Sequence, residues 1–194
     1  MAKLRWNDTV WTRTQAVALW AVGIGALVND RPNYMVAAYC GIAQHEPPMV
    51  ALSLNKMHYT NIGIRKTGAF SINIPSTDLV ERVDHCGIVS GRTDDKSQCF
   101  TPFYGKLGTA PMAAECPLNL ECRLVMVLDL LGPNELFIGE IVETYVNGEL
   151  AADGTVDPAR LDPLVFSTMD NCYRKLGPVV AEAWEVGRCR RPRD

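Results

Sequence analysis

Two runs of alternating apolar and polar residues, 117–129 and 135–146, constrain the fold of this chain most strongly. In the first half of 117–129 and along 135–146, apolar side chains recur at every second position, the period of a strand that buries one face. Gly132, Pro133 and Asn134 lie between the two runs and are typical turn residues. The pattern therefore predicts a long β-hairpin.

The first 55 residues contain three more apolar runs, 15–25, 34–43 and 49–55, which we interpret as strands. Dense turn signals at 29–33 and 44–48 separate them. We expect the first two strands to pair with each other. Three strands in succession with short turns are typical of an antiparallel meander or barrel.

The middle of the chain predicts short elements. Residues 69–75 alternate and predict a half-buried strand, while 106–109 and 164–166 predict two short strands. Two short helices are expected over 60–68 and 77–87. The sum is a mainly β domain, a β-barrel with short helices, because closing the sheet removes its exposed edges.

Composition narrows the class of protein. The 194 residues predict one domain, with 1–14 and 188–194 as peripheral extensions. A net charge of −3 does not favour nucleic acid or anionic membranes as partners. No apolar stretch approaches the roughly 18 residues of a membrane span, and the N-terminus lacks the apolar core of a signal peptide. Seven cysteines without C-x-x-C spacing predict free thiols in a reducing compartment, hence the cytoplasm, and no metal site.

The stretch 53–61 is the first candidate site. A strand leads into a polar turn and then into a helix for which Thr60 is the expected N-cap. Helix N-termini bind anions through their backbone N–H groups and their dipole, and Ser53 and Lys56 add donors. This predicts a phosphate pocket. The same stretch also fits an ordinary capped helix after a core strand, which is the commoner arrangement.

Three further features carry polar chemistry. In the loop 90–96, Gly91 lets the backbone approach a ligand closely, and Arg92 and Lys96 can neutralise a phosphate; a solvated loop with local ion pairs is the alternative. Asn33 is either a ligand contact or a turn former. Tyr173, near Gly177, is either an aromatic lid over a planar ligand or a packing residue.

Signals for other chemistries are absent from the sequence. There is no G-x-G-x-x-G, no Walker loop and no G-x-S-x-G elbow. His45, His58 and His85 form no recognisable pairing with a cysteine nucleophile. We therefore predict no catalytic side chain.

Taken in order, seven segments resemble one family, the flavin reductase-like proteins with an FMN-binding split barrel, of the flavoredoxin branch. The resemblance covers about residues 15–187, and its segments are 32–38, 47–54, 59–62, 69–75, 86–92 with Asp95 and Lys96, 117–122 and 137–142. It implies an FMN-binding split β-barrel. It also implies a homodimer with FMN near the interface and the phosphate in the turn 53–60.

The resemblance also implies the cofactor-binding residues. The segments that would reach FMN contain Asn33, Tyr34, Met35, Val36, Ala37, Leu52, Ser53, Leu54, Lys56, His58, Tyr59, Thr60, Ser90, Gly91, Asp95 and Lys96. Family members often carry Arg near the position of Lys56, so the side chain that meets the phosphate stays open. Lys96 is expected to stabilise negative charge on the reduced flavin.

The function implied is that of an FMN-dependent oxidoreductase, an NAD(P)H-dependent flavin reductase or a flavoredoxin-like electron-transfer protein. The flavin carries the chemistry and the fold positions it, which agrees with the lack of a predicted acid–base group. One alternative is a flavoprotein that takes electrons from a redox protein partner without direct use of NAD(P)H. Another is a non-catalytic flavin or haem carrier, with a histidine as haem ligand.

Overall fold

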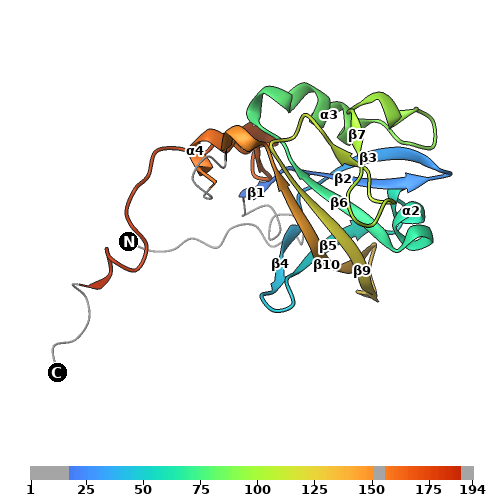
Figure 1. Cartoon of the computed structure of the whole chain (residues 1–194), viewed down its shortest axis with the longest axis horizontal. Coiled ribbons are helices and arrows are strands. Elements are labelled where there is room, and N and C mark those ends of the chain that lie inside the picture. Colours follow the sequence, from blue (N-terminus) through green and yellow to red (C-terminus); the bar gives the residue numbers. More distant parts are fainter. Residues whose placement is uncertain (1–17, 151–155, 189–194) are drawn as a thin grey trace.

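The computed structural model of the chain describes residues 18–150 and 156–188. Its main feature is an antiparallel sheet of seven strands (Figure 1). In spatial order these are β3 (Arg31–Ala37), β2 (Val22–Val28), β6 (Ala69–Ile74), β9 (Leu118–Asp129), β10 (Asn134–Val146), β5 (Met49–Asn55) and β4 (Cys40–Gln44). The smaller strands are β1 (Ala18–Trp20), β11 (Val165–Ser167) and β12 (Cys172–Arg174) in one sheet, and β7 (Pro102–Phe103) with β8 (Met112–Ala113) in another.

The connection between β3 and β4 shows why the large sheet closes. These strands lie at opposite ends of the spatial order, yet only Ala38 and Tyr39 separate them in the sequence. The sheet must therefore curl until its two ends meet. The backbone N–H of Ser53 in β5 donates to the carbonyl of Tyr39 at 2.9 Å, at this junction. The mainly β barrel expected from the sequence is confirmed.

The predicted long hairpin is also confirmed. β9 and β10 pair antiparallel along nearly their whole length, with Leu136 opposite Leu128 and Phe137 opposite Val127. Two register irregularities interrupt the ladder, between Ile138 and Gly139 and between Ile141 and Glu143. Bulges of this kind bend a strand and increase its twist, which suits a barrel wall.

Two apolar cores follow from the alternation of side chains along the strands. One fills the barrel and includes Leu52, Phe70 and Phe137. The other lies outside it and includes Tyr34 and Cys86.

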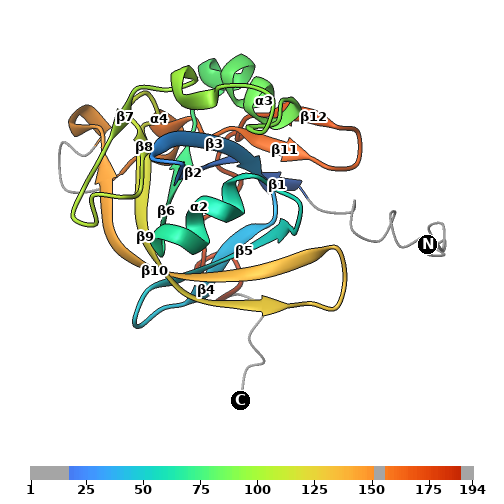
Figure 2. The same cartoon turned by 90° about the vertical axis from the view of Figure 1, so that its right-hand side faces the viewer.

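Helices pack against the barrel, and two of them contribute Ile64 and Leu161 to the core that fills it. The α-helices are α2 (Thr60–Thr67), α3 (Val80–Ile88) and α4 (Pro158–Leu161), and the 3₁₀ helices are η1 (Thr77–Leu79), η2 (Lys96–Gln98) and η3 (Gly148–Leu150). α2 lies against β2 and α3 against β3 (Figure 2). α2 ends at Gly68, as predicted from the sequence, and Gly68 has the left-handed conformation with φ of 67°. In the described part of the chain, no helix has the length and apolar character needed to cross a bilayer.

Several predicted strands need correction. The run 34–43 is two strands because the chain passes from one end of the sheet to the other at Ala38 and Tyr39. The run 15–25 is likewise divided at Ala21, whose N–H donates to the carbonyl of Leu164. Residues 106–109 form a loop and no strand, because a buried carboxylate, Glu121, accepts the backbone N–H groups there.

Strand β6 is buried on both faces, whereas its sequence predicts burial on one. Ser71 and Asn73 point out of the barrel but are covered by the segment 111–113. The Ser71 hydroxyl donates to the carbonyl of Pro111, and Asn73 accepts from the N–H of Ala113 at 2.9 Å. Alternating polarity therefore marked hydrogen-bonding positions here and not solvent exposure.

Candidate functional site

Three adjoining cavities form one groove along β3. The first, of about 370 Å³, lies between residues 28–33 and the loop 91–96. The second, of about 220 Å³, lies between 57–60 and 86–91. The third, of about 260 Å³, reaches 53–55, Asn134, Phe166 and Thr168. We call these the first, second and third compartments.

Shared wall residues show that the compartments are continuous. Tyr59, Gly91 and Lys96 line both the first and the second compartment. Met35, Val36 and His58 line both the second and the third. Joined in this way, the groove falls in the size range of about 300–1,000 Å³ typical of ligand pockets. Most of the residues predicted to bind a cofactor line it: Asn33, Met35, Val36, Ala37, Ser53, Leu54, His58, Tyr59, Thr60, Ser90, Gly91, Asp95 and Lys96.

The start of α2 forms one wall of the groove. Thr60 is the first residue of the helix and not its N-cap; the cap position belongs to Tyr59, which has helical dihedral angles and no side-chain capping bond. The Asn33 amide nitrogen instead donates to the Thr60 hydroxyl oxygen at 2.8 Å, and both side chains are buried. Asn33, which the structure places in strand β3 and not in the hairpin turn, thus fixes the orientation of the hydroxyl at the helix start.

The loop 90–96 forms the facing wall. The Ser90 carbonyl accepts the N–H groups of Thr93 and Asp94 at 3.0 and 2.9 Å, which holds the loop in a tight turn. Gly91 lies so close to the other wall that an added Cβ would be 2.2 Å from Asn33 Oδ1 and 2.6 Å from Tyr59 Cδ1. The sequence predicted a close approach of this glycine to a ligand, and in the structure its backbone closely approaches the side chains of the facing wall.

The charged groups of this loop have different partners. The Arg92 guanidinium lies over the ring of Tyr59, 5.4 Å from its centroid. Asp95 accepts the N–H of Ser97 at 2.9 Å and lies 3.7 Å from the guanidinium of Arg31. The hydrogen bonds from Ser97 lower the pKa of Asp95, so this carboxyl is charged at neutral pH.

Lys96 is the buried cation of the groove, with 5% of its surface exposed. Its Nζ donates to the carbonyl of Cys86 in α3 at 2.8 Å. Burial lowers the pKa of Lys96, against the smaller opposite effect of Cys86 and other acidic groups. Burial, and then the charge of Lys96, lower the pKa of His58, which is therefore neutral at pH 7.

Three residues predicted as cofactor contacts do not line the groove. Leu52 is buried inside the barrel. Tyr34 packs into the outer core against Phe100, with ring centroids 5.3 Å apart. Lys56 turns towards the β9–β10 hairpin, where its Nζ lies 2.7 Å from Asp129 Oδ1. The first two follow from strand alternation, and the third depends on a partner more than seventy residues away in the sequence.

Other groove residues were not predicted from the sequence. Asn29 lies in the turn of the first hairpin and Arg31 begins β3, while Asn134 donates to the Ser53 hydroxyl at 3.2 Å. Phe166 reaches the third compartment from β11. Turn signals were visible at 29–33 and 132–134, but nothing local indicated that the turns would border a pocket.

Tyr173 packs on the barrel and does not lie over the groove. Its ring contacts Phe166, with centroids 5.6 Å apart, and its hydroxyl donates to Asp84 at 3.0 Å. Burial and Asp84 raise the pKa of Tyr173 to about 12. The packing interpretation of this residue is the one that fits.

Cysteine chemistry does not contribute a metal centre in the described residues. The six described cysteines are free thiols, and no group of three or more His, Cys, Asp or Glu side chains is placed to hold a metal ion there. The seventh, Cys189, lies outside the described residues. Burial raises the pKa of Cys86 and of Cys116 to about 12.

The curled β-barrel and the groove along β3, which is polar at the end near α2, together indicate the class of protein to which the chain belongs. Residues 14–173 match the family described as the flavin reductase like domain, and the chain belongs to that family. The split-barrel fold expected from the resemblance is thereby confirmed.

Individual relatives are similar over most of the chain. Flavoredoxin from Methanosarcina acetivorans is 36% identical with a TM-score of 0.91, over 98% of this chain and 100% of that chain. Flavoredoxin of Desulfovibrio vulgaris (Miyazaki F) is 34% identical with a TM-score of 0.84, over 94% of this chain and 100% of that chain. An uncharacterized protein of Archaeoglobus fulgidus is 29% identical over 130 residues, 66% of this chain and 72% of that protein.

Proposed function

We propose that the chain binds FMN in the groove along β3 and acts as an oxidoreductase, either an NAD(P)H-dependent flavin reductase or a flavoredoxin-like electron-transfer protein. The observation that carries the proposal is the continuity of the groove. It joins the first turn of a helix and a charged loop, which carries Arg92 and Lys96 as well as Asp94 and Asp95, at one end to an apolar strand wall at the other. FMN has the same division between a dianionic phosphate and a planar, largely apolar ring.

The phosphate would occupy the end between α2 and the loop 90–96. Because Asn33 donates to the Thr60 oxygen, the Thr60 O–H proton is left for an acceptor in the groove. The first turn of α2 adds the positive end of the helix dipole. Arg92 supplies a cation next to Tyr59. A phosphate with about −1.5 to −2 charges needs this combination of donors and positive charge.

The flavin ring would lie along Met35, Val36 and Ala37. The side chain of Val36 would exclude water from one side of the ring. The backbone of this strand would offer hydrogen-bonding groups to the polar edge of the ring. When bound, FMN supplies the electron-carrying chemistry. Lys96 holds a positive charge in the second compartment, which would favour the more negative, reduced form of a bound ring.

Lys56 is not part of the phosphate site proposed between α2 and the loop 90–96, because its ammonium group pairs with Asp129. It therefore serves as a matched control. FMN titration by fluorescence quenching should show affinity weakened by about tenfold or more in Arg92→Met, the scale of one lost charge-assisted hydrogen bond. The same titration with Lys56→Met should match the wild type. Equal loss in both variants, or in neither, would contradict the proposed position of the phosphate.

NAD(P)H is the expected reductant. Visible spectra taken before and after anaerobic addition of NADH or NADPH test this point. Bleaching of the flavin band supports direct use of NAD(P)H. A band that persists with both nucleotides, but is lost on addition of a reduced redox protein, supports the alternative of electron transfer from a protein partner. If the purified protein is colourless and does not bind added FMN, the proposed function is refuted. A Soret band in the spectrum would identify a haem carrier instead.

We further propose a homodimer with the cofactor near its interface. The third compartment supports this, because it is open and is lined by exposed or half-buried residues such as Tyr39 and Phe166. The cytoplasm is the proposed location. That proposal rests on the six free thiols, which suit a reducing compartment.

A further inference from the structure

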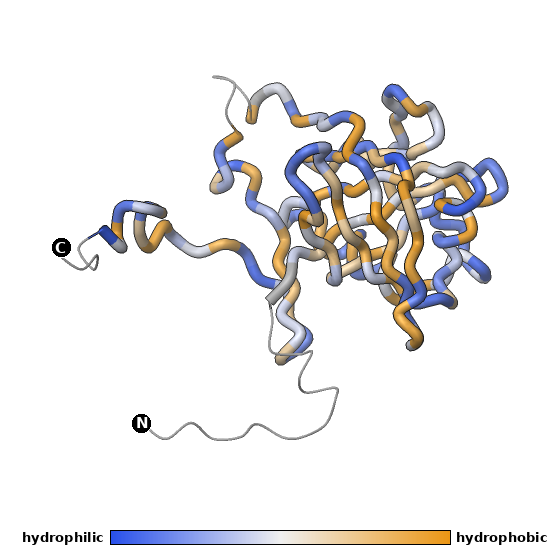
Figure 3. The backbone as a smooth tube through the Cα atoms, turned by 90° about the horizontal axis from the view of Figure 1, so that it is seen from below, coloured by the Kyte–Doolittle hydropathy of each residue, from blue (hydrophilic) through white to orange (hydrophobic). Residues whose placement is uncertain are grey.

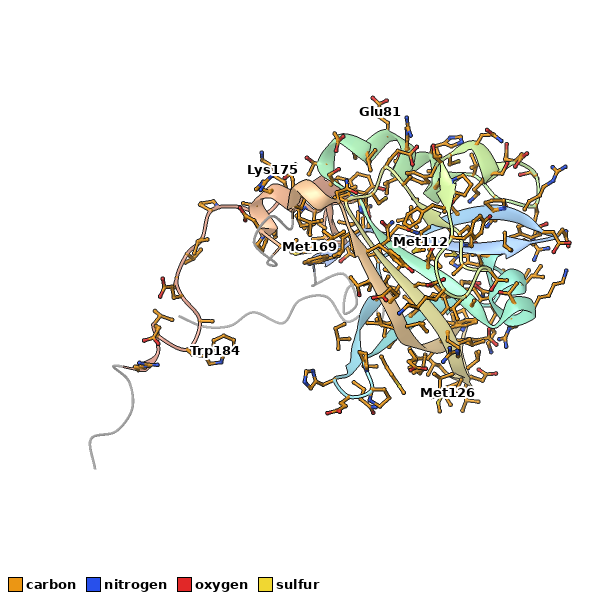
Figure 4. All side chains as sticks on the ribbon, in the orientation of Figure 1. Glu81, Met112, Met126, Met169, Lys175 and Trp184 are labelled. Atoms are coloured by element: carbon orange, nitrogen blue, oxygen red, sulfur yellow. The ribbon has the colours of Figure 1, made fainter. Side chains whose placement is uncertain are left out.

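The C-terminal segment 176–186, which we call the arm, leaves the barrel after β12. It extends away from the body and carries alternating apolar and polar stretches (Figures 1 and 3). Its apolar side chains are almost fully exposed: Val179 by 88%, Val180 by 97% and Trp184 by 90%. In Figure 4 the Trp184 side chain lies well away from the barrel.

Nothing in the described body of the protein covers these side chains. Two backbone hydrogen bonds at the end of the arm are local, from Val186 N–H to the Glu182 carbonyl at 3.3 Å and from Arg188 N–H, just after the arm, to the Glu185 carbonyl at 3.0 Å. Ordering an extended segment costs conformational entropy. Valine and tryptophan side chains that stay exposed bury no apolar surface, so they do not offset this cost. Such a segment is stabilised when another surface covers it.

A second exposed apolar surface lies at the end of the β9–β10 hairpin. We call it the tip. Leu131 is 95% exposed there, and Met57, in the turn that follows β5, is 75% exposed. The Lys56 N–H donates to the carbonyl of Pro133 at 2.9 Å, so the turn that carries Met57 adjoins the hairpin end. Met57 also lines the second compartment of the groove. The other exposed apolar residues of the hairpin end are Val125, Met126, Leu128 and Leu130.

The arm does not cover the tip of its own chain. In Figure 4, Trp184 lies out to the left of the barrel, whereas Met126 lies at the lower edge of the barrel itself, well apart from it. A second copy of the chain carries both surfaces and removes this difficulty. In a two-fold dimer each arm can meet the other copy's tip, so that one contact is made twice.

We propose that the arm of one protomer packs on the tip of a second copy, and that the reverse contact completes a homodimer. The inference rests on the homodimer of the proposed function and adds the elements that form it. The exposed side chains of one arm carry on the order of 600 Å² of apolar surface, so two arms and the surfaces they cover reach the size of stable interfaces, about 1,200–2,000 Å².

This arrangement bears on the groove as well. The third compartment is lined by Phe166 and Thr168, next to the strand from which the arm departs, and by Asn55 and Asn134, at the base of the tip. An arm that binds the tip would lie beside the third compartment of the other copy. The partner would then border the open end of the cofactor groove.

Sedimentation equilibrium on the full chain tests the contact. The arm variant Val180→Asp/Trp184→Asp and the tip variant Leu130→Asp/Leu131→Asp are both expected to raise the dimer dissociation constant by at least a hundredfold. Ile62→Asp, which places the same charge at an exposed apolar site on α2, should leave it unchanged. A monomeric wild type at micromolar concentration, or an arm variant that dimerises like the wild type, would overturn the inference.

Photo-crosslinking identifies the surface that the arm meets. With p-benzoylphenylalanine at position 180, irradiation should yield a covalent dimer whose crosslinked peptide contains residues 125–131. Crosslinks confined to one chain, or dimer crosslinks to another surface, would refute the assignment. FMN titration of the same samples separates the two proposals: bound FMN with an arm that makes no such contact removes only the arm inference, whereas failure to bind FMN removes the proposed function.

Discussion

Gly91→Ala perturbs the groove by a single methyl group. The backbone of Gly91 is not in the left-handed region, so alanine is not strained by its own dihedral angles. The added Cβ, however, would lie 2.2 Å from Asn33 Oδ1 and 2.6 Å from Tyr59 Cδ1. Both distances are far below van der Waals contact. Either the loop 90–96 moves outward or the Asn33 side chain leaves its position.

The magnitude follows from the bond that Asn33 makes. Displacing Asn33 breaks its 2.8 Å hydrogen bond to Thr60, and both groups are buried. Leaving a buried polar group without its partner costs about 1–3 kcal/mol. We expect the free energy of unfolding to fall by about that amount. FMN affinity should fall by roughly tenfold or more, because about 1.4 kcal/mol corresponds to tenfold and the Thr60 hydroxyl loses its orientation.

Urea unfolding and FMN fluorescence titration measure the two effects, and Gly87→Ala is the matched control. Gly87 lines the same groove, but a Cβ there would meet only Val36, at 3.8 Å. Since Gly87 lies within α3, alanine should raise stability by about 0.5–1 kcal/mol. If Gly91→Ala unfolds and binds FMN like the wild type, the close contact between the two walls is not a determinant of the site.

Further predictions concern the buried charges and thiols. Burial lowers the pKa of Lys96 below its ordinary value of 10.5. As the pH rises towards 10.5, the folded chain therefore releases the Lys96 proton before the unfolded chain does. The free energy of unfolding of the wild type should then rise with pH relative to that of Lys96→Met. A reversed or absent difference in urea titrations across this range would argue against a buried Lys96. Iodoacetamide pulses with mass spectrometry should modify exposed Cys172 first and leave Cys122, buried with a raised pKa, protected until unfolding. Glu121→Gln should lower the free energy of unfolding by about 1–3 kcal/mol, because one amide oxygen replaces the two carboxyl oxygens that accept from the N–H groups of Lys106 and Leu107. Unchanged stability in that variant would show that the loop is held by other contacts.

Local patterns in the sequence determined most of the barrel. The period of two in 117–129 and 135–146 predicted the β9–β10 hairpin because one of its faces packs against the core. The bounds of β5 matched the run 49–55, and Gly68 ended α2 where the sequence placed the end. These features depend on neighbours a few residues away, which a sequence displays directly.

The tertiary structure alone decided which polar groups meet. In the sequence, Lys56 and Lys96 both lie in polar segments, and either could be a phosphate or flavin ligand. In the structure, Lys56 pairs with Asp129, whereas Lys96 is buried in the groove. Thr60 was an obvious capping residue, and its real partner is Asn33, 27 residues earlier. The choice of such partners depends on how the sheet curls and where distant turns come together, because a side chain's hydrogen bonds are set by position in space and not by spacing along the chain.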